Sequence, residues 1–423
     1  MATAYTGKMP TEAQGCGPRV PSAPAGLRVP RRQIFEAVRA AGTLSRAQVA
    51  KELGISPASV TTQTSELIEM GLLREVTHPR SADDAGRGRP PVALGVSPMA
   101  HVVGGVKLSD QTHTAILADF AGNELSTASE DAKRIDSPAA AIGATGRLLA
   151  SAAAKIGIAP ASLSCVGIGL PGFVDHAAGH VYWSPILTER GVDFAAEATR
   201  ALGTPVRIDN DANLVAMAEL WFGAGRHLSD FAVVTIEHGL GMGLVVDHRV
   251  YRGAQGVGME LGHTKVEMDG ALCRCGQRGC LEAYVADYAL AREAAQALGR
   301  PDSALPTARL IEVLHAEAKA GNVAAHSIFR RAGRYLATGL ANVLNLFDPQ
   351  LVILSGGRMN YDYLYAGDAL GDLSGLTLDT GRGVPKIEVH AWGDLLWAYG
   401  AAALALSDVT ERALGQARGK APA

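Results

Sequence analysis

Three cysteines with the spacing Cys-x-Cys-x4-Cys lie in the second half of the chain, and a histidine precedes the first of them by ten residues. Thiolates and imidazole are the usual ligands of zinc, and four protein ligands close its tetrahedral shell, so that no reactive water is held. The chain has five cysteines and begins without an apolar leader segment, which favours a metal over disulfides. We predict a structural Zn²⁺ site, with three unligated cysteines as the alternative. Its ligands would be His263, Cys273, Cys275 and Cys280.

Arg274 and Arg278 lie within the same glycine-bent loop and are expected to offset part of the thiolate charge. The loop carries few apolar residues of its own. A metal would therefore supply much of the order that the loop needs.

A second candidate for chemistry is the run Asn210-Asp211, which joins a strand-like segment to a helix-like one. Asp211 has two interpretations of similar weight. Its carboxylate could act as a general base or bind a hydroxyl group, or it could cap the helix that follows. A glycine-rich turn at 167–175 follows another strand-like segment.

Residues 29–97 carry a pattern typical of DNA contact. Apolar spacing predicts helices over 31–41, 45–53 and 56–71, and the turn Gly54-Ile55-Ser56 joins the last two into a helix-turn-helix. The third helix would enter the major groove, where glutamine can pair with adenine. Small and polar residues on its free face are the predicted DNA contacts: Ala58, Ser59, Thr62 and Gln63.

Two strand patterns, at 72–76 and 92–96, flank a polar loop and predict a β-hairpin wing. The loop contains Arg87 and Arg89 in the run Gly86-Arg87-Gly88-Arg89-Pro90, and arginines flanked by glycine fit a narrow minor groove. Two alternatives stay open. The three helices could form a packing or dimerisation bundle, and the arginine loop could be a solvated linker.

The rest of the chain alternates strand-like and helix-like runs, which predicts an α/β body with mixed sheets. Strands are expected at 102–106, 114–118, 165–169, 206–208, 232–236, 244–246, 352–354 and 387–389. Helices are expected at 138–153, 211–222, 281–298 and 326–345.

Composition and charge exclude some classes of protein. The net charge is −3, yet residues 1–98 carry 12 Lys and Arg against 8 Asp and Glu, which indicates a basic module on an acidic body. Because no run of about 18 apolar residues occurs, we expect no membrane span and a cytoplasmic location. Residues 1–28 and 409–423 are expected to be tails, the first of them disordered.

These motifs together resemble the ROK family of repressors, open reading frames and sugar kinases. The most specific match runs from Gly262-His263 through the cysteine loop to Glu282, and the resemblance covers about residues 30–408. It implies a winged helix-turn-helix at 29–97, followed by a two-lobed body of the actin/hexokinase type at 98–408. The lobes would span about 98–215 and 216–392, with a closing helix at 393–408. The resemblance also implies a sugar-binding set: Gly172, Asn210, Asp211, Glu260, His263 and Glu282.

The sequence departs from the kinase pattern of that family at both phosphate loops. Where kinases have Asp-x-Gly-Gly-Thr, this chain has Lys107-Leu108-Ser109-Asp110-Gln111. Where they have Gly-Thr-Gly-x-Gly, this chain begins with Glu237. Glycines let backbone N–H groups approach phosphates, and phosphoryl transfer depends on charge neutralisation. We therefore expect no enzymatic activity, although Asp211 keeps the position of the kinase base.

The resulting expectation is a sugar-responsive DNA-binding regulator, most often a repressor of carbohydrate-metabolism genes in this family. It would bind a double-stranded operator as a homodimer or homotetramer, since one short recognition helix reads few base pairs. Two alternatives stay open: an ATP-dependent sugar kinase of the same fold, and a regulator controlled by a protein partner.

Overall fold

The computed structural model describes residues 4–5, 15–19, 30–77, 92–132, 135–299, 305–356, 359, 370–371, 373–379, 381, 383–391, 393 and 395–415. The chain forms two units. Unit 1 comprises residues 1–7, 230–246 and 250–393, and unit 2 comprises residues 8–229, 247–249 and 394–423.

Unit 2 begins with three short helices, α1 (Pro30–Ala41), α2 (Arg46–Leu53) and α3 (Pro57–Glu69). The Ser45 hydroxyl accepts a hydrogen bond from Gln48 N, and the Gln48 side chain accepts one from Ser45 N, which forms the expected capping box. Gly54 ends α2 in the left-handed conformation, with φ of 62°. These local signals explain why the helices begin and end where the sequence predicted.

Three strands complete this part of the chain: β2 (Thr43–Ser45), β3 (Leu73–Thr77) and β4 (Val92–Val96). They pair in the order β2-β4-β3, all antiparallel. The hairpin β3–β4 is the expected wing. Strand β2 was not expected, because three residues between two helices carry no alternation to reveal it.

The body of unit 2 is a five-stranded sheet in the order β11-β8-β5-β6-β7. Strands β5, β8 and β11 run parallel, and β6 and β7 extend the sheet as an antiparallel meander. The strands are β5 (Val102–Lys107), β6 (Thr112–Asp119), β7 (Glu124–Asp131), β8 (Cys165–Leu170) and β11 (Val206–Asn210), and a separate hairpin joins β9 (Phe173–Asp175) to β10 (His180–Trp183).

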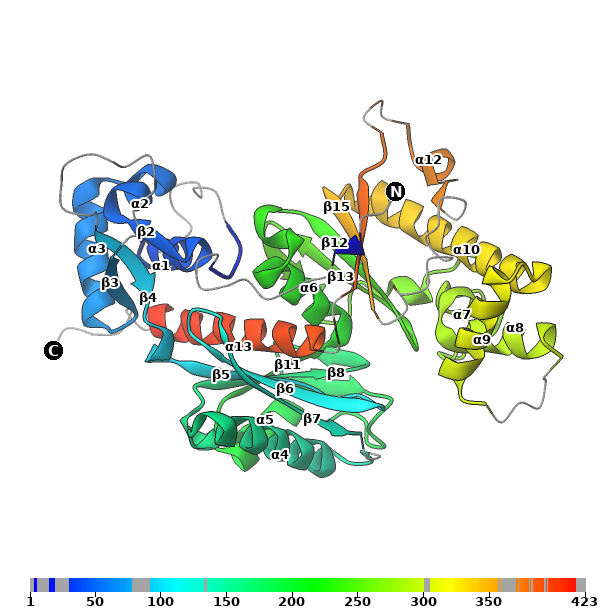
Figure 1. The fold of residues 1–423 in the computed structure, drawn as a ribbon, viewed down its shortest axis with the longest axis horizontal. Coiled ribbons are helices and arrows are strands. Elements are labelled where there is room, and N and C mark those ends of the chain that lie inside the picture. The colour runs from blue at the N-terminus through cyan, green and yellow to red at the C-terminus, as the bar shows by residue number, and fades with distance from the viewer. Residues whose placement is uncertain are drawn as a thin grey trace. The chain divides into compact units, whose positions relative to one another are not determined.

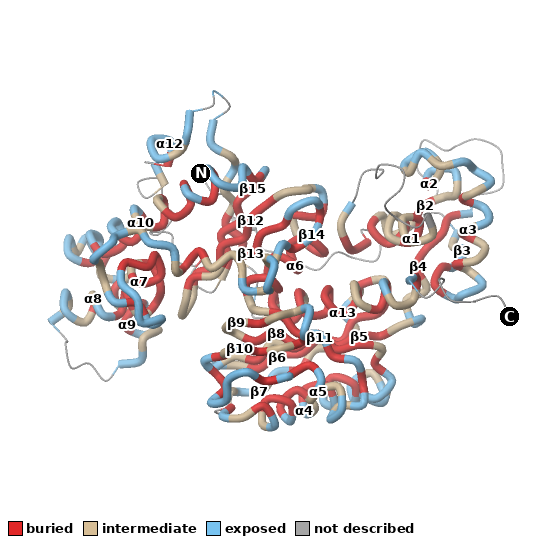
Figure 2. Tube along the Cα trace, turned by 180° about the vertical axis from the view of Figure 1, so that it is seen from behind, coloured by how far each residue is buried: buried red, intermediate tan, exposed pale blue. Residues whose placement is uncertain are grey.

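Helices cover both faces of this sheet. On one side, α13 (Leu396–Gly415) lies along β5 and β8 beside α6 (Asp211–Phe222), and α4 (Pro138–Ile156) and α5 (Phe194–Leu202) lie on the other (Figure 1). All six residues of β8 are buried, as expected for a strand that is covered on both faces. Figure 2 shows this central part of the sheet as buried and the outer side of α4 as largely exposed.

Residues 15–19 correct the expectation of a disordered tail over residues 1–28. Gly15, Cys16 and Gly17 are buried, and backbone hydrogen bonds hold the segment: Cys16 N donates to Arg39 O at 3.0 Å, and Gly17 N donates to Trp221 O at 2.9 Å. Composition rich in Gly and Pro indicated a solvated chain. The hydrogen bonds come from partners far away in sequence, which composition cannot reveal.

Unit 1 is built on a six-stranded sheet in the order β1-β16-β15-β12-β13-β14. Strands β1, β16, β15 and β12 are parallel to one another, and β12 and β13 form an antiparallel hairpin. The strands are β1 (Ala4–Tyr5), β12 (Phe231–Ile236), β13 (Leu240–Val246), β14 (Arg249–Tyr251), β15 (Leu351–Ser355) and β16 (Lys386–His390).

The helices described in unit 1 share an apolar core with this sheet. They are α7 (Glu282–Val285), α8 (Asp287–Ala297), α9 (Thr307–Lys319), α10 (Val323–Phe347) and α12 (Leu373–Leu376). The single helix expected over 281–298 is wrong: Ala286 has extended backbone angles and separates α7 from α8. Asp287 N donates to Glu237 O, a tertiary contact that replaces a helical hydrogen bond.

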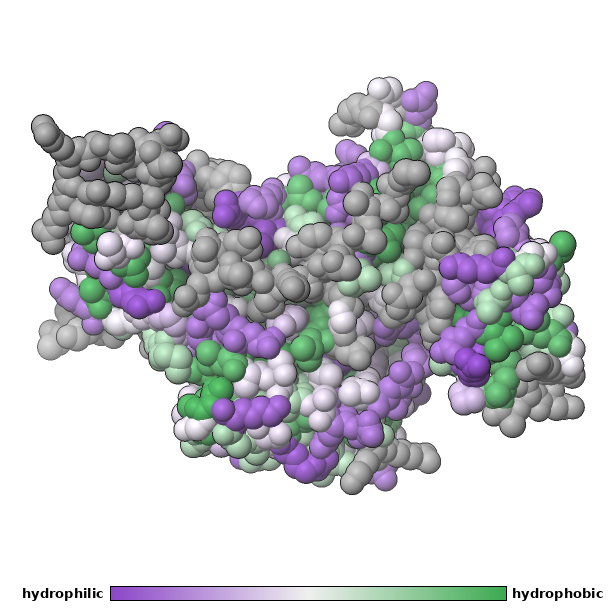
Figure 3. Space-filling model, in the orientation of Figure 1, coloured by the Kyte–Doolittle hydropathy of each residue, from purple (hydrophilic) through white to green (hydrophobic). Residues whose placement is uncertain are grey.

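The visible surface is mixed in polarity. Over α4 and β7, Figure 3 shows hydrophilic side chains interspersed with small and hydrophobic ones. None of the helices that the structure describes is both long enough and apolar enough to cross a membrane.

Candidate metal centre, effector residues and DNA-facing helix

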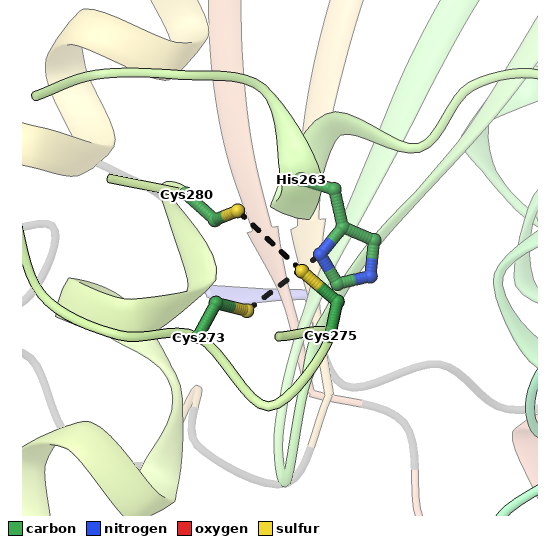
Figure 4. Close-up of side chains that lie close together, drawn as sticks. All are labelled: His263, Cys273, Cys275 and Cys280. Carbon is green, nitrogen blue, oxygen red and sulfur yellow. Dashed lines mark hydrogen bonds between the residues drawn. The ribbon is translucent and has the colours of Figure 1, made fainter. Parts of the chain in front are cut away.

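The four expected metal ligands lie together in unit 1. Their ligand atoms all lie within 4.8 Å of one another. Figure 4 shows the side chains of His263, Cys273, Cys275 and Cys280 gathered around one point. Cys273 and Cys280 are buried, His263 is half-buried and Cys275 is exposed. The fold thus brings together a cluster that could hold a metal ion.

Two separations within the cluster are close to those of a tetrahedral site. The Sγ atoms of Cys275 and Cys280 are 3.7 Å apart, and Cys273 Sγ lies 3.8 Å from His263 Nδ1. Metal–sulfur bonds of about 2.3 Å and metal–nitrogen bonds of about 2.0 Å place tetrahedral ligand atoms roughly 3.5–3.8 Å apart. Nδ1 is therefore the ring nitrogen that faces the sulfurs.

Short turns give the cysteine loop its shape. Gly276 N donates to Cys273 O at 3.0 Å, and Cys273 N donates to Gln277 O at 2.8 Å. Gly276 and Gly279 have φ of 86° and 74°, in the left-handed region. A Cβ atom on Gly279 would lie 1.6 Å from Glu267 O, so only glycine fits there.

Lys265 is a neighbour of the sulfurs that the sequence did not single out. Its Nζ lies 3.0 Å from Cys280 Sγ and 2.6 Å from Gln277 Oε1, and its backbone pairs with Cys280 in an isolated antiparallel bridge. The ammonium group thus places a positive charge beside this sulfur. The only available signal was a lysine two residues after the histidine, which is too common a pattern to interpret.

The two arginines of the loop contact other groups. The Arg274 guanidinium lies over the ring of Tyr288, 4.1 Å from its centroid. Arg278 Nη1 donates to Gly270 O at 3.2 Å. Arg274 thus makes a stacking contact and Arg278 a loop-closing hydrogen bond, and the expectation that they offset part of the thiolate charge stays a prediction.

Glu282 joins the cysteine loop to the turn between β12 and β13. Its Oε2 accepts a hydrogen bond from Leu240 N at 3.2 Å, and its Oε1 lies 3.4 Å from the Tyr288 hydroxyl and 3.6 Å from Cys273 Sγ. Burial raises the pKa of the Cys273 thiol. The carboxylate that the family resemblance assigned to sugar is thus 9% exposed and is engaged inside unit 1.

Glu260 and His263 stand at the two ends of a short 3-10 turn, η5 (Leu261–His263). Met259, just before it, has φ of 68°, a strained value for a residue with a side chain. A Cβ atom on Gly262 would lie 2.2 Å from Leu240 O, so the turn packs directly onto β13. This close packing fixes the directions of Glu260 and His263.

In unit 2, the other expected sugar-binding residues follow two adjacent parallel strands. Asn210 ends β11 and is paired in register with Leu170, which ends β8 two residues before Gly172. Gly172 has φ of 112°, and a Cβ atom there would lie 2.3 Å from Trp183 O. Because the strands are parallel, their carboxyl ends meet at one edge, the usual place for a ligand in an open α/β sheet.

Asp211 begins α6, and Asn210 caps it by accepting a hydrogen bond from Asn213 N at 2.8 Å. Both side chains are half-buried, whereas the neighbouring Asp209 is fully buried. Asp209 Oδ1 accepts hydrogen bonds from Asn210 N and from Asn213 Nδ2, both at 2.9 Å. Asp209 is thus a supporting residue that sequence reasoning missed, because it shares a strand face with the exposed Arg207 and no local pattern marks it as buried.

The six residues of the expected sugar set are divided between the two units. Gly172, Asn210 and Asp211 belong to unit 2. Glu260, His263 and Glu282 belong to unit 1.

The segment 107–111, where kinases of the family have their first phosphate loop, connects β5 to β6. It forms a turn that is held by hydrogen bonds of the Ser109 side chain. Ser109 Oγ donates to Thr112 O at 2.8 Å and accepts from Gln111 N and Thr112 N, at 3.4 and 3.2 Å. Lys107 Nζ lies 3.7 Å from the centroid of the Trp397 ring. Backbone N–H groups that a phosphate loop would leave open are therefore used within this turn.

The second such position is the turn between β12 and β13. Glu237 N donates to Gly239 O at 2.9 Å. A Cβ atom on Gly239 would lie 2.9 Å from Glu282 Oε2, so a carboxylate stands close to the turn.

Helix α3 presents the expected DNA-facing residues at its surface. Ala58 and Thr62 are exposed, and Ser59 and Gln63 are half-buried. Arg31 Nε donates to Gln63 Oε1 at 3.4 Å, which directs the amide nitrogen of Gln63 away from α1. Arg87 and Arg89, the expected wing contacts, lie outside the described residues.

A family model described as "ROK family" matches residues 105–408, and one described as "Winged helix-turn-helix DNA-binding" matches residues 30–74. The chain belongs to the ROK family and carries a winged helix-turn-helix ahead of the ROK body.

Relatives include regulators and kinases. A xylose repressor of Caldicellulosiruptor bescii is 26% identical over 372 residues, covering 86% of this chain and 92% of the repressor. A glucokinase of Streptomyces coelicolor is 35% identical over 202 residues, covering 45% of this chain and 64% of the kinase.

The solved structures that resemble this chain are also regulators and kinases. A ROK family transcriptional regulator, described as a homolog of the E. coli MLC protein, superposes with a TM-score of 0.75 at 25% identity, covering 91% of this chain and 96% of the regulator. A ROK glucokinase of Streptomyces griseus in complex with glucose and AMPPNP has a TM-score of 0.61 at 28% identity, covering 72% of this chain and 99% of the kinase. The regulators match more of this chain than the kinases do.

Proposed function

We propose that this protein is a sugar-responsive DNA-binding repressor of carbohydrate-metabolism genes. The observation that carries the proposal is the joining, in one chain, of a winged helix-turn-helix to a ROK body with Asn210 and Asp211 at the carboxyl edge of its sheet. Carboxylates and amides suit sugars because they accept and donate several hydrogen bonds in fixed directions. Sugar binding would change the position of the recognition helices and release the operator.

The residues at both phosphate-loop positions favour a regulator that does not transfer phosphate. Ser109 uses the N–H groups of its own turn, and Lys107 stands where an acidic residue would help to place Mg²⁺. Glu237 and Glu282 add negative charge beside the second turn, where phosphate would lie. Like charges oppose phosphate binding, so these residues support a sensor rather than a kinase.

We also propose that the Cys3His cluster binds zinc through three Sγ atoms and His263 Nδ1. The cluster has four soft or borderline ligands and no oxygen ligand, which suits zinc and disfavours magnesium or calcium. When bound, zinc would supply order to the cysteine loop and would orient the His263 ring, so that Nε2 could meet a sugar hydroxyl.

The proposed operator complex is a homodimer or homotetramer. Its DNA-binding part would span residues 29–97, and its sensor would run from residue 98 through α13, which continues to Gly415 beyond the expected end at residue 408. A dimer places two recognition helices on half-sites about one helical turn apart, which multiplies selectivity.

Operator binding in the presence of sugars tests this function. A duplex selected from a random library by the full-length protein would be titrated by fluorescence anisotropy, with and without D-xylose, D-glucose or N-acetyl-D-mannosamine. We expect one of these sugars to raise the operator Kd by about tenfold or more. An operator Kd that stays constant with every sugar would contradict a sugar-released repressor and would favour control by a protein partner.

Asp211→Asn tests the sugar site with little change of shape. The amide keeps an oxygen that can accept from Ala212 N, as Asp211 Oδ1 does at 2.9 Å, but it loses the carboxylate charge. We expect the variant to bind the operator as the wild type does and to need about tenfold or more sugar for release. Isothermal calorimetry with the active sugar measures the lost affinity. An unchanged sugar affinity would remove Asp211 from the site.

The kinase alternative has its own test. A coupled ATP assay on the same three sugars, with a ROK glucokinase as the positive control, should give no turnover. Turnover that disappears in Asp211→Asn would establish a kinase instead.

A further inference from the structure

Residues Gly15–Arg19, which we call the strap, run between the DNA-binding part and the sensor body within unit 2. Successive hydrogen bonds tie the strap to both sides. Cys16 N donates to Arg39 O on α1, whereas Gly17 N donates to Trp221 O on α6 and Arg19 N donates to Arg226 O. The strap therefore connects the first helix of the DNA-binding part to the end of a sensor helix.

The strap is packed so closely against its neighbours that larger side chains do not fit at its contacts. A Cβ atom on Gly15 would lie 2.3 Å from Arg39 O and 2.4 Å from Gly42 N. Cys16 is buried, and a Cβ atom on Gly122, in the turn between β6 and β7, would lie 2.3 Å from its Sγ. Such close packing transmits a displacement instead of absorbing it.

A buried guanidinium reinforces the junction. Arg39 is 3% exposed, and its guanidinium lies 4.5 Å from the centroid of the Trp221 ring. Its Nη1 donates to Thr410 Oγ1 on α13 at 2.7 Å, while its Nε has no hydrogen-bond partner among the described residues. The charge of Glu36 favours the cation, but the hydrogen bonds described for Arg39 include none to a carboxylate, so these contacts recover only part of the desolvation cost. Arg39 thus joins α1 to both α6 and α13 at one buried position.

Arg226 makes a second tie. It lies in the short 3-10 turn η4 (Ala224–His227) that follows α6. Its Nη2 donates to Ala40 O at the end of α1, and its Nε donates to Gly17 O in the strap, at 2.6 and 3.2 Å. Helix α1 is thus held by a side chain as well as by the strap.

Helix α6 connects this junction to the proposed sugar site. It begins at Asp211, beside its cap Asn210, and Trp221 is its second-last residue. Twelve residues of α-helix span about 18 Å, and every residue of α6 after Asp211 is buried. A Cβ atom on Gly400 of α13 would lie 1.9 Å from Leu214 O, so α6 and α13 are in direct backbone contact.

We propose that α6 acts as the coupling element of this regulator: a sugar bound at Asn210 and Asp211 displaces α6, and Trp221, Arg39 and the strap pass the displacement to α1 of the DNA-binding part. The inference rests on the proposed function, since it names the route by which sugar changes operator affinity. The coupling is a free energy between the two sites, and its measure is the change in operator affinity that the sugar causes.

Three variants and a matched control measure that free energy. Trp221→Leu removes the aromatic face, and Arg39→Lys keeps the charge but not the planar guanidinium. Gly15→Ala displaces the strap, because the added Cβ atom would overlap Arg39 O and Gly42 N. The control is Gly203→Ala, because Gly203 has a left-handed φ of 67°, close to the 65° of Gly15, with nothing within 4 Å of its added Cβ atom. For each protein, the operator Kd is measured with and without the sugar that acts on the wild type, and the sugar Kd is measured by calorimetry.

We expect the ratio of the two operator Kd values to fall from about tenfold in the wild type toward one in the three junction variants. The sugar Kd should stay within about twofold, and the Gly203→Ala ratio should equal that of the wild type. Junction variants that keep the wild-type ratio would overturn the coupling route while leaving the repressor function intact. A wild-type ratio of one with every sugar would instead remove the proposed function, and the coupling with it. If Trp221→Leu does not fold, Arg39→Lys and Gly15→Ala decide the question.

Discussion

At the scale of residues, the metal cluster shows how few side chains define a site. Three sulfurs and one nitrogen approach one another because two glycines turn the loop back on itself, and Lys265 brings a positive charge to Cys280. The remaining polar partners, Tyr288 and Glu282, connect the loop to the β12–β13 turn. Loss of one sulfur should therefore affect both the metal and the elements around it.

Cys275→Ser tests the metal directly, because Cys275 is exposed and its truncation opens no buried cavity. We expect the metal content to fall from one zinc per chain to none, and the free energy of unfolding to fall by about 3 kcal/mol or more. Elemental analysis and chemical denaturation measure the two effects. Cys165→Ser, a buried cysteine on β8 outside the cluster, is the control and should keep its zinc. Full zinc in Cys275→Ser would disprove the fourth ligand.

At the scale of elements, α13 is the helix around which unit 2 is packed. Glycines bring its backbone against two strands: a Cβ atom on Gly105 would lie 2.2 Å from Ala398 O, and one on Gly167 would lie 2.0 Å from Ala401 O. Side chains at these positions would push the helix off the sheet. Glycine in a strand is thus required here by close backbone approach, not by a turn.

Gly400→Ala tests the contact between α13 and α6. In an open helix this change is neutral or stabilising, but here the added Cβ atom meets Leu214 O at 1.9 Å. We expect the free energy of unfolding to fall by about 2–4 kcal/mol, measured by urea denaturation. Gly415→Ala, at the end of the same helix with nothing within 4 Å, should be neutral or stabilise by up to about 1 kcal/mol. Equal effects of the two changes would contradict the close contact.

An ion-pair group fastens α13 to β11 and gives a pH-dependent prediction. Asp408 Oδ1 accepts from Arg207 Nε at 2.6 Å, and its Oδ2 accepts from Arg412 Nε at 2.7 Å. Burial of Asp408 raises the pKa of its carboxyl, but the hydrogen bonds and charges of the two arginines outweigh burial and lower that pKa below its ordinary value of 3.8. The stabilisation is therefore complete above the ordinary pKa and is lost as the pH falls through the lower, folded-state pKa.

Asp408→Asn should cost about 1 kcal/mol at about pH 7, a small effect because solvent screens Arg207 and Arg412, which are 44% and 40% exposed. The difference from the wild type should shrink as the pH falls below 3.8 and then through the lower folded-state pKa of Asp408, because the carboxyl becomes protonated first in the unfolded chain and then in the folded one. Denaturation curves of both proteins across this range measure it. A difference that grows on acidification would have the wrong sign for this ion pair.

At the scale of the whole molecule, one chain joins a basic DNA-facing module to a larger body of the kinase fold. The wing supplies a prediction that belongs to this scale. Arg87→Ala combined with Arg89→Ala should weaken operator binding and reduce the slope of log Kd against log salt by about two, one for each lost phosphate-region contact. Arg147→Ala, an exposed arginine on α4, is the control and should leave the slope unchanged. An unchanged slope in the double variant would make the loop a linker.

The sequence by itself determined whatever depends on local chemistry. The capping residues Ser45 and Ser56 set the helix starts at α2 and α3, and continuous apolar runs predicted β5 and β8. The spacing of Cys273, Cys275 and Cys280 indicated a metal, because a short loop is enough to bring ligands that are close in sequence near one another in space.

Tertiary structure alone decided the features whose partners are distant in sequence. Cys16 is buried because Arg39 O lies opposite its N–H, and the helix expected over 281–298 breaks because Glu237 O captures Asp287 N. Lys265, Asp209 and Trp221 likewise have roles that no local pattern indicates, since each depends on a neighbour placed by the fold. Local propensity is a few tenths of a kcal/mol per residue, so one buried hydrogen bond or close packing contact overrides it.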